Sequence, residues 1–154
     1  MTVSVPIPGL ADLHLEHLLL DVNGTMTNRG ALIGDLADRI GRLSETLELR
    51  LVSADTFGTL DTVARLLHVS AVRATTGEEK LRVLDGLGRG RCAVIGNGAN
   101  DALVLEAAAL GIAVLGPEGA SAAALRCADV VCVSAADALE LLLDPKALSA
   151  TLRP

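Results

Sequence analysis

Two carboxylates in this chain each follow an apolar run of the kind that forms a buried β-strand. Asp21 comes directly after residues 18–20, and Asp101 ends the stretch 97–101, which follows the apolar run 91–95. Ligands of an open α/β sheet bind beyond the carboxyl ends of its strands, so both positions are where such a fold builds a site. We therefore expect an α/β protein with its functional residues at one edge of the sheet.

The remaining pattern alternates strands with helices along the chain. Strands are expected at 18–20, 48–53, 69–73, 91–95, 112–115 and 130–133, and helices at 34–47, 57–67, 78–87, 100–110, 120–126 and 135–143. This alternation predicts βαβ crossovers and a mostly parallel sheet with helices on both faces. Residues 18–20 lack polar alternation, which favours the central strand.

The 154 residues fit one domain with a substantial core. We expect that core at about 10–143 and a short β-hairpin flap at 24–33. Pro145 is expected to end the last helix, leaving 146–154 as a tail that is either mobile or docked on a partner. The connection that follows Asp21 is filled by the expected hairpin, helix and strand, so it leaves no room for an inserted domain that would cover the site.

The composition excludes several classes of function. A net charge of -6 and scattered basic residues argue against nucleic acid as a partner. Neither a membrane span nor a secretory signal pattern is visible, so we expect a cytoplasmic protein without membrane insertion. The three cysteines show no metal-binding spacing and are expected to be buried free thiols. His14 and His17 are interpreted as surface or edge histidines, not as metal ligands.

Four chemical groups follow one another at these strand and helix ends: the carboxylate of Asp21, the hydroxyl of Ser53, the cation of Lys80 and the carboxylate of Asp101. Taken singly, Ser53 could be a helix N-cap and Lys80 a solvated helix residue. Together, and in this order, they resemble the motifs of the haloacid dehalogenase (HAD) superfamily of phosphotransferases. The resemblance covers most of the chain and implies a HAD-like three-layer Rossmannoid fold without a cap.

Within that superfamily, three stretches are similar to soluble HAD proteins related to P-type ATPases, and more loosely to capless phosphatases of sugar-acid phosphates. The stretches are 21–25 (DVNGT), 54–59 (ADTFGT) and 96–101 (GNGAND). The resemblance implies a phosphohydrolase or phosphotransferase that forms an aspartyl phosphate on Asp21. A carboxylate nucleophile of this kind divides one difficult displacement into two easier ones.

The resemblance also implies a role for each residue of the site. Asp21 and Asp101 would hold Mg²⁺ together with the carbonyl of Asn23, and Asn97 would orient a metal-bound water. Ser53 would hydrogen-bond the phosphate, and Lys80 would neutralise its charge. The expected catalytic residues are Asp21, Asn23, Ser53 and Lys80; the expected phosphate-binding residues are Asn23, Gly24, Ser53, Ala54, Lys80 and Asn100.

Two departures from the family pattern keep alternatives open. Asn23 stands where HAD phosphatases carry a second aspartate as general acid and base, and Asn97 stands where the fourth motif commonly has aspartate. The first departure predicts slow hydrolysis, because an amide does not exchange a proton usefully. The alternative is a catalytically degenerate HAD-fold binding or regulatory module. A third reading, docking on a membrane transporter, rests on fold-level analogy alone.

The absence of a cap also bears on substrate and assembly. Capless HAD members either cover the site by oligomerisation or act on large substrates. We expect a small phosphorylated substrate, and a homo-oligomer, dimer or tetramer, in which a partner covers the flap. The reason is that Met26, Leu32 and Ile33 of the flap would otherwise be exposed.

Overall fold

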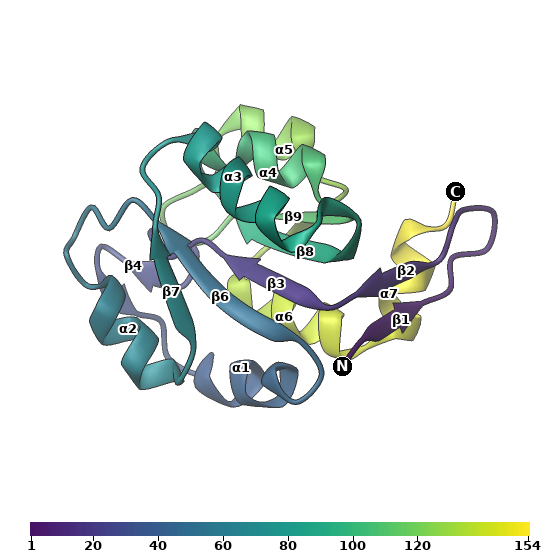
Figure 1. Ribbon diagram of the computed structural model, residues 1–154, viewed down its shortest axis with the longest axis horizontal. Coiled ribbons are helices and arrows are strands. Elements are labelled where there is room, and N and C mark those ends of the chain that lie inside the picture. Colours follow the sequence, from purple (N-terminus) through teal and green to yellow (C-terminus); the bar gives the residue numbers. More distant parts are fainter.

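The computed structural model describes residues 1–154 and has a parallel six-stranded sheet at its centre (Figure 1). The strand order is β10-β9-β8-β3-β6-β7, and every neighbouring pair is parallel. The six strands are β3 (His17–Leu20), β6 (Glu48–Ser53), β7 (Ser70–Arg73), β8 (Cys92–Gly96), β9 (Leu110–Val114) and β10 (Val130–Cys132). The predicted central strand is confirmed as β3, between β6 and β8.

Helices cover both faces of this sheet, which confirms the predicted α/β class. In Figure 1, α3, α4 and α5 lie on one face, and α1, α2 and α6 lie on the other. Their bounds are α1 (Ala37–Ser44), α2 (Leu60–Leu67), α3 (Gly77–Leu87), α4 (Ala102–Ala107), α5 (Ala122–Cys127) and α6 (Ala135–Leu143). α2 begins three residues later than expected, because Asp55 and Gly58 adopt left-handed backbone angles (φ 59° and 67°) in the preceding loop.

Alternation along β3 divides the interior into two apolar clusters. Leu18 and Leu20 belong to the larger cluster, on the face of α1 and α6, whereas Leu19 belongs to the smaller cluster, on the face of α3 and α4. Successive side chains of a strand point to opposite faces, so the residue two places after Leu19 is directed toward α3. That residue is Asp21.

The prediction that residues 146–154 form a tail is wrong for most of this segment. Residues 145–152 form helix α7 (Pro145–Leu152), whose Leu148 is fully buried in the larger cluster. Pro145 begins this helix at the first-turn position, where a missing N–H costs nothing, and the Asp144 carboxylate caps it by accepting from two backbone N–H groups. α7 packs against the N-terminal hairpin of β1 (Val3–Val5) and β2 (Leu13–Leu15).

The predicted flap is present as the hairpin of β4 (Thr27–Asn28) and β5 (Ala31–Leu32). Its expected exposure is wrong in one respect, because Met26 is fully buried within this single chain. The Met26 carbonyl accepts the N–H of Ile33 at 2.9 Å, which closes the base of the hairpin, and the Met26 side chain lies in the larger apolar cluster. Leu32 and Ile33 are half-buried, so less apolar surface needs covering than the sequence suggested.

The remaining sequence expectations concern cysteines, histidines and membranes. All three cysteines are free thiols, but only Cys92 is buried, and burial raises its pKa to about 11. His14 is exposed on β2, and His17 starts the central strand beside Glu48. No helix is long and apolar enough to serve as a membrane crossing.

Candidate active site

The candidate site lies where the direction of the chain through the sheet reverses. From β3 the chain proceeds outward to β6 and β7, then returns to the other side of β3 with β8. Crevices at such switch points, beyond the carboxyl ends of the strands, are the usual ligand sites of open α/β sheets. Asp21 follows β3 and Asn97 follows β8, and the N–H of Asp21 donates to the carbonyl of Ile95 at 2.9 Å.

Lys80 joins the two carboxylates predicted from the sequence. Its Nζ donates to Asp21 Oδ1 at 2.8 Å and to Asp101 Oδ1 at 2.6 Å. The ammonium comes from α3, on the face toward which strand alternation directs Asp21. The exposed fractions are 2% for Lys80, 8% for Asp21 and 1% for Asp101. Three ionisable groups are therefore withdrawn from water together, and they carry one net negative charge when all are ionised.

This arrangement changes the acid–base properties of both partners. Burial and the neighbouring Asp101 raise the pKa of Asp21 from 3.8 to about 7, although Lys80 opposes the shift. Burial alone would lower the pKa of Lys80, but the attraction of two carboxylates outweighs it and the pKa of Lys80 is raised. Lys80 thus remains an ammonium, whereas Asp21 is only partly ionised near neutral pH, and a further cation would favour its carboxylate form.

A short 3₁₀ turn, Ala99–Asp101, fixes the orientation of Asp101. Asp101 Oδ2 accepts the backbone N–H groups of Asn97 at 3.1 Å and Gly98 at 2.9 Å, which leaves Oδ1 for Lys80. A Cβ atom at Gly96 would lie 2.6 Å from Asp101 Cγ, so only glycine fits at the end of β8. The glycines of this motif thus make room for the carboxylate.

Thr25 connects the two halves of the site and is the one contacting residue that the sequence analysis did not single out. Its buried hydroxyl lies 3.3 Å from Asp21 Oδ2 and 3.2 Å from Asn97 Oδ1. The Asn97 amide donates from Nδ2 to the carbonyl of Gly119 at 3.0 Å, which leaves its Oδ1 to accept from the Thr25 hydroxyl. A hydroxyl in the first motif, four residues after Asp21, was the available signal.

Gly24 allows this close approach of the first and fourth motifs. It has a φ of 75°, and a Cβ there would lie 2.5 Å from Asn97 Nδ2. Any larger residue would therefore push Asn97 away and strain the backbone at once. This close packing against Asn97 explains why the predicted site has glycine at position 24.

The other predicted residues lie at the same sheet edge without hydrogen bonds to the Lys80 cluster. Ser53 ends β6, is fully buried, and accepts the N–H of Asp55 at 2.9 Å, so its own proton can be donated. Ala54 and Asn100 are half-buried beside it and beside Asp101 respectively. The side chain of half-buried Asn23 makes no hydrogen bond within the chain, while its backbone pairs with Thr27.

The donor set suits a hard divalent cation. Asp21 and Asp101 share the Lys80 ammonium, and Asp21 and the amide oxygen of Asn97 share the Thr25 hydroxyl, so carboxylate and amide oxygens gather at this edge. No group of three or more histidine, cysteine or acidic side chains is placed to hold a metal anywhere in the chain. Oxygen ligands of this kind match Mg²⁺, which retains several waters when bound by few carboxylates. A divalent cation would change the net charge of the cluster from minus one to plus one, which complements a phosphate.

Comparisons with known proteins agree with this geometry at the level of fold. No protein-family model matches the chain. The uncharacterized protein MJ0073 of Methanocaldococcus jannaschii is 42% identical over 78 residues, which are 48% of this chain and 84% of that protein.

Solved structures resemble the chain over most of its length. A probable YrbI family phosphatase from Pseudomonas syringae has a TM-score of 0.70 at 20% identity, covering 88% of this chain and 89% of that one. A 3-deoxy-D-manno-octulosonate 8-phosphate phosphatase from Moraxella catarrhalis, with magnesium, phosphate and KDO bound, has a TM-score of 0.65 at 18% identity, covering 90% and 94%. These matches confirm the predicted capless HAD fold.

The likeness to P-type ATPases is also found, over a smaller part of the matched protein. A zinc-transporting PIB-type ATPase in its E2.Pi state has a TM-score of 0.65 at 27% identity, covering 79% of this chain but only 20% of that one. Both classes named from the sequence motifs therefore share the architecture described above.

Proposed function

We propose that this chain, which has the HAD fold and belongs to the same family as its Methanocaldococcus relative, is a slow Mg²⁺-dependent phosphohydrolase or phosphotransferase acting on a small phosphorylated substrate. One observation carries the proposal: Lys80 holds Asp21 and Asp101 together, buried, at the switch point of the sheet. Burying three charges is costly, and a site that keeps them is better explained by chemistry than by stability.

In the proposed reaction, Asp21 attacks the phosphorus of a phosphate ester and the ester oxygen departs. The bond from Asp21 to phosphorus forms as the bond to the leaving oxygen breaks, and water later hydrolyses the aspartyl phosphate to regenerate Asp21 and release phosphate. Lys80 neutralises charge on the transferring oxygens, and Ser53 donates its free proton to one of them. Mg²⁺, held by Asp21, Asp101 and the carbonyl of Asn23, with Asn97 orienting a bound water, would supply further positive charge to the phosphate.

The proposed slowness has its origin at residue 23. The leaving alkoxide needs a proton and the attacking water must lose one, and acid–base assistance of this kind contributes about 10²–10⁴-fold. Asn23 has its side chain free of internal hydrogen bonds, so it could contact a leaving group, but an amide neither gains nor loses the proton. We therefore expect phosphorylation of Asp21 to outpace its hydrolysis.

Binding of beryllium fluoride, a mimic of aspartyl phosphate, tests the proposal directly. Calorimetry should detect binding to the wild-type protein with Mg²⁺ present, and no binding after Mg²⁺ is removed. Asp21→Asn serves as the control, because it lacks the carboxylate that the mimic must coordinate. If neither beryllium fluoride nor phosphate binds in a Mg²⁺-dependent way, the proposal that this chain is an enzyme is wrong.

A second candidate is a HAD-fold binding or regulatory module, favoured by the asparagines at both positions 23 and 97. This candidate predicts that phosphate binds without turnover. Assays with a panel of phosphomonoesters separate the two, because only the enzyme releases phosphate in amounts exceeding one equivalent of protein.

We also propose a homo-oligomer that covers the flap side of the site. Exposed apolar side chains support it, with Leu115 40%, Val131 49% and Val133 72% accessible along the β10 edge of the sheet. Light scattering at micromolar concentration should give a mass of two or four chains. A species of 15.8 kDa alone would contradict this prediction.

A further inference from the structure

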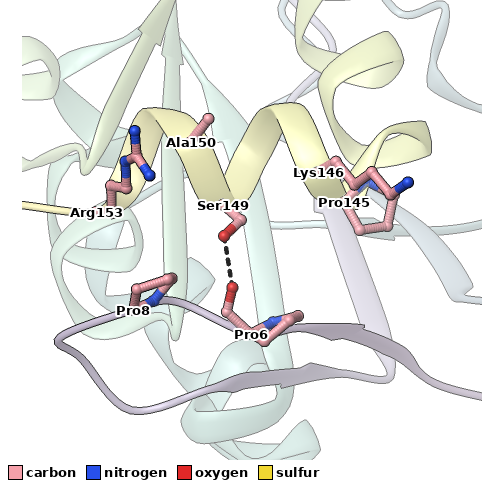
Figure 2. A pocket seen from close by; sticks show the side chains of 7 residues that line it. All are labelled: Pro6, Pro8, Pro145, Lys146, Ser149, Ala150 and Arg153. Atoms are coloured by element: carbon pink, nitrogen blue, oxygen red, sulfur yellow. Dashed lines mark hydrogen bonds between the residues drawn. The ribbon is translucent and has the colours of Figure 1, made fainter.

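A pocket lies between the N-terminal loop and helix α7, and none of its lining residues belongs to the candidate active site (Figure 2). β2 leads into the amino end of β3, so this pocket adjoins the opposite end of the sheet from Asp21, as Figure 1 shows. Its volume is about 250 Å³. The lining residues are Pro6, Pro8, Pro145, Lys146, Ser149, Ala150 and Arg153.

The walls of this pocket are fixed before any ligand arrives. Ser149 donates from Oγ to the carbonyl of Pro6, which ties α7 to the loop across the pocket (Figure 2). Asp144 caps the start of α7, and Leu148 anchors the helix in the core. Three proline rings and the methyl group of Ala150 supply apolar surface at little cost in conformational entropy.

The charge of this pocket opposes that of the chain. Lys146 and Arg153 line it, neither side chain forms a salt bridge or a hydrogen bond, and no acidic residue is among the lining residues. Most cations elsewhere in this chain of net charge -6 are paired with carboxylates, although Arg82 and Arg126, outside this pocket, are not. An anionic ligand would thus find two uncommitted cations beside an apolar wall.

The spacing of the two cations favours an extended ligand. Lys146 lies in the first turn of α7 and Arg153 directly follows the last residue of the helix, seven positions later, which corresponds to about 10 Å at 1.5 Å per residue. A polyproline-type segment advances about 3.1 Å per residue with three residues per turn, so acidic residues three positions apart lie on one side at about 9 Å. Figure 2 shows Lys146 and Arg153 at opposite ends of the pocket, which favours a ligand that spans it over a single small anion.

From these observations, we propose that this pocket binds an extended acidic peptide segment of a partner protein. Two carboxylates three positions apart pair with Lys146 and Arg153, and the residues between them, prolines in the simplest case, pack on the rings of Pro6, Pro8 and Pro145. The site is independent of the proposed phosphoryl chemistry, because none of its residues belongs to the Asp21 cluster.

Fluorescence anisotropy with a labelled short peptide, two glutamates flanking two prolines, tests this proposal on the full chain. The peptide should bind wild-type protein, and the glutamine version should bind about tenfold more weakly, the combined effect of two exposed ion pairs. Lys146→Gln with Arg153→Gln should give the same loss. Arg82→Gln with Arg126→Gln is the matched control, since it removes two exposed, unpaired cations elsewhere and should leave binding unchanged.

Other outcomes would overturn the proposal. These are no binding to wild type, equal binding by the pocket variant and its control, or displacement of the peptide by inorganic phosphate or a single-stranded oligonucleotide at equal charge concentration. Circular dichroism checks that each variant is folded. Beryllium fluoride binding at Asp21 should be the same in the pocket variant and wild type, so the two proposals fail separately.

Discussion

Replacing Lys80 with methionine is expected to lower the free energy of unfolding by about 3–5 kcal/mol in metal-free buffer, the range found when one partner of a buried ion pair is removed. The substitution keeps the length of the side chain but leaves Asp21 and Asp101 facing each other with no cation between them. Urea unfolding followed by far-UV circular dichroism measures the loss. Tryptophan fluorescence is no option, because the chain has no tryptophan.

The other lysine of the chain gives the matched control. Lys146→Met removes an exposed ammonium without a salt bridge and should change stability by less than about 0.5 kcal/mol. Adding Asp21→Asn to Lys80→Met should recover much of the loss, because it removes one of the two unpaired carboxylates. A Lys80→Met variant as stable as Lys146→Met would show that the buried cluster is not ionised as described.

The loss caused by Lys80→Met should also depend on pH. The pKa of Asp21 is about 7 in the folded protein against 3.8 in the unfolded chain, and it rises further when Lys80 is removed. Between these values the folded state binds more protons than the unfolded state, so stability rises as pH falls. We therefore expect a smaller loss at about pH 5 than at about pH 8.

The sequence predicted the parts of this site that depend on local rules. Strand ends follow from apolar runs, and parallel strands bring their carboxyl ends to one edge, which places Asp21 and Asp101 together. The position of Lys80 is predictable for the same reason, since alternation after Leu19 directs Asp21 toward the face that α3 covers. The short motifs were therefore sufficient to predict most of the fold and the charged cluster.

Features that depend on distant partners were not predictable from the same rules. From the sequence Met26 is expected to be an exposed flap residue, but it lies at the base of the hairpin and packs in the core. The segment after Pro145 reads as a tail, yet an Asp144 cap and a place for Leu148 in the core make it a helix. Thr25 lies within the first motif, but its contact with Asn97 could not be predicted from local patterns, because the two residues are 72 positions apart.

Asn23→Asp is expected to raise phosphatase turnover by at least tenfold, against a ceiling of about 10⁴ for acid–base assistance. Aspartate hardly changes the side-chain volume, and the half-buried Asn23 side chain makes no internal hydrogen bond that the substitution would break. Its new carboxyl group can protonate the leaving oxygen and then accept a proton from water. Steady-state assays with saturating Mg²⁺ and a panel of phosphomonoesters measure the gain.

Two controls make this gain interpretable. Combining Asn23→Asp with Asp21→Asn should abolish it, because the added proton carrier assists only a reaction that passes through Asp21. Peptide mass mapping must also exclude spontaneous deamidation, since Asn23 and Asn97 both precede glycine and aged wild-type protein could acquire a carboxylate at position 23. If verified Asn23→Asp protein turns over no faster than intact wild type, residue 23 does not limit hydrolysis, and Asn97 becomes the residue to replace next.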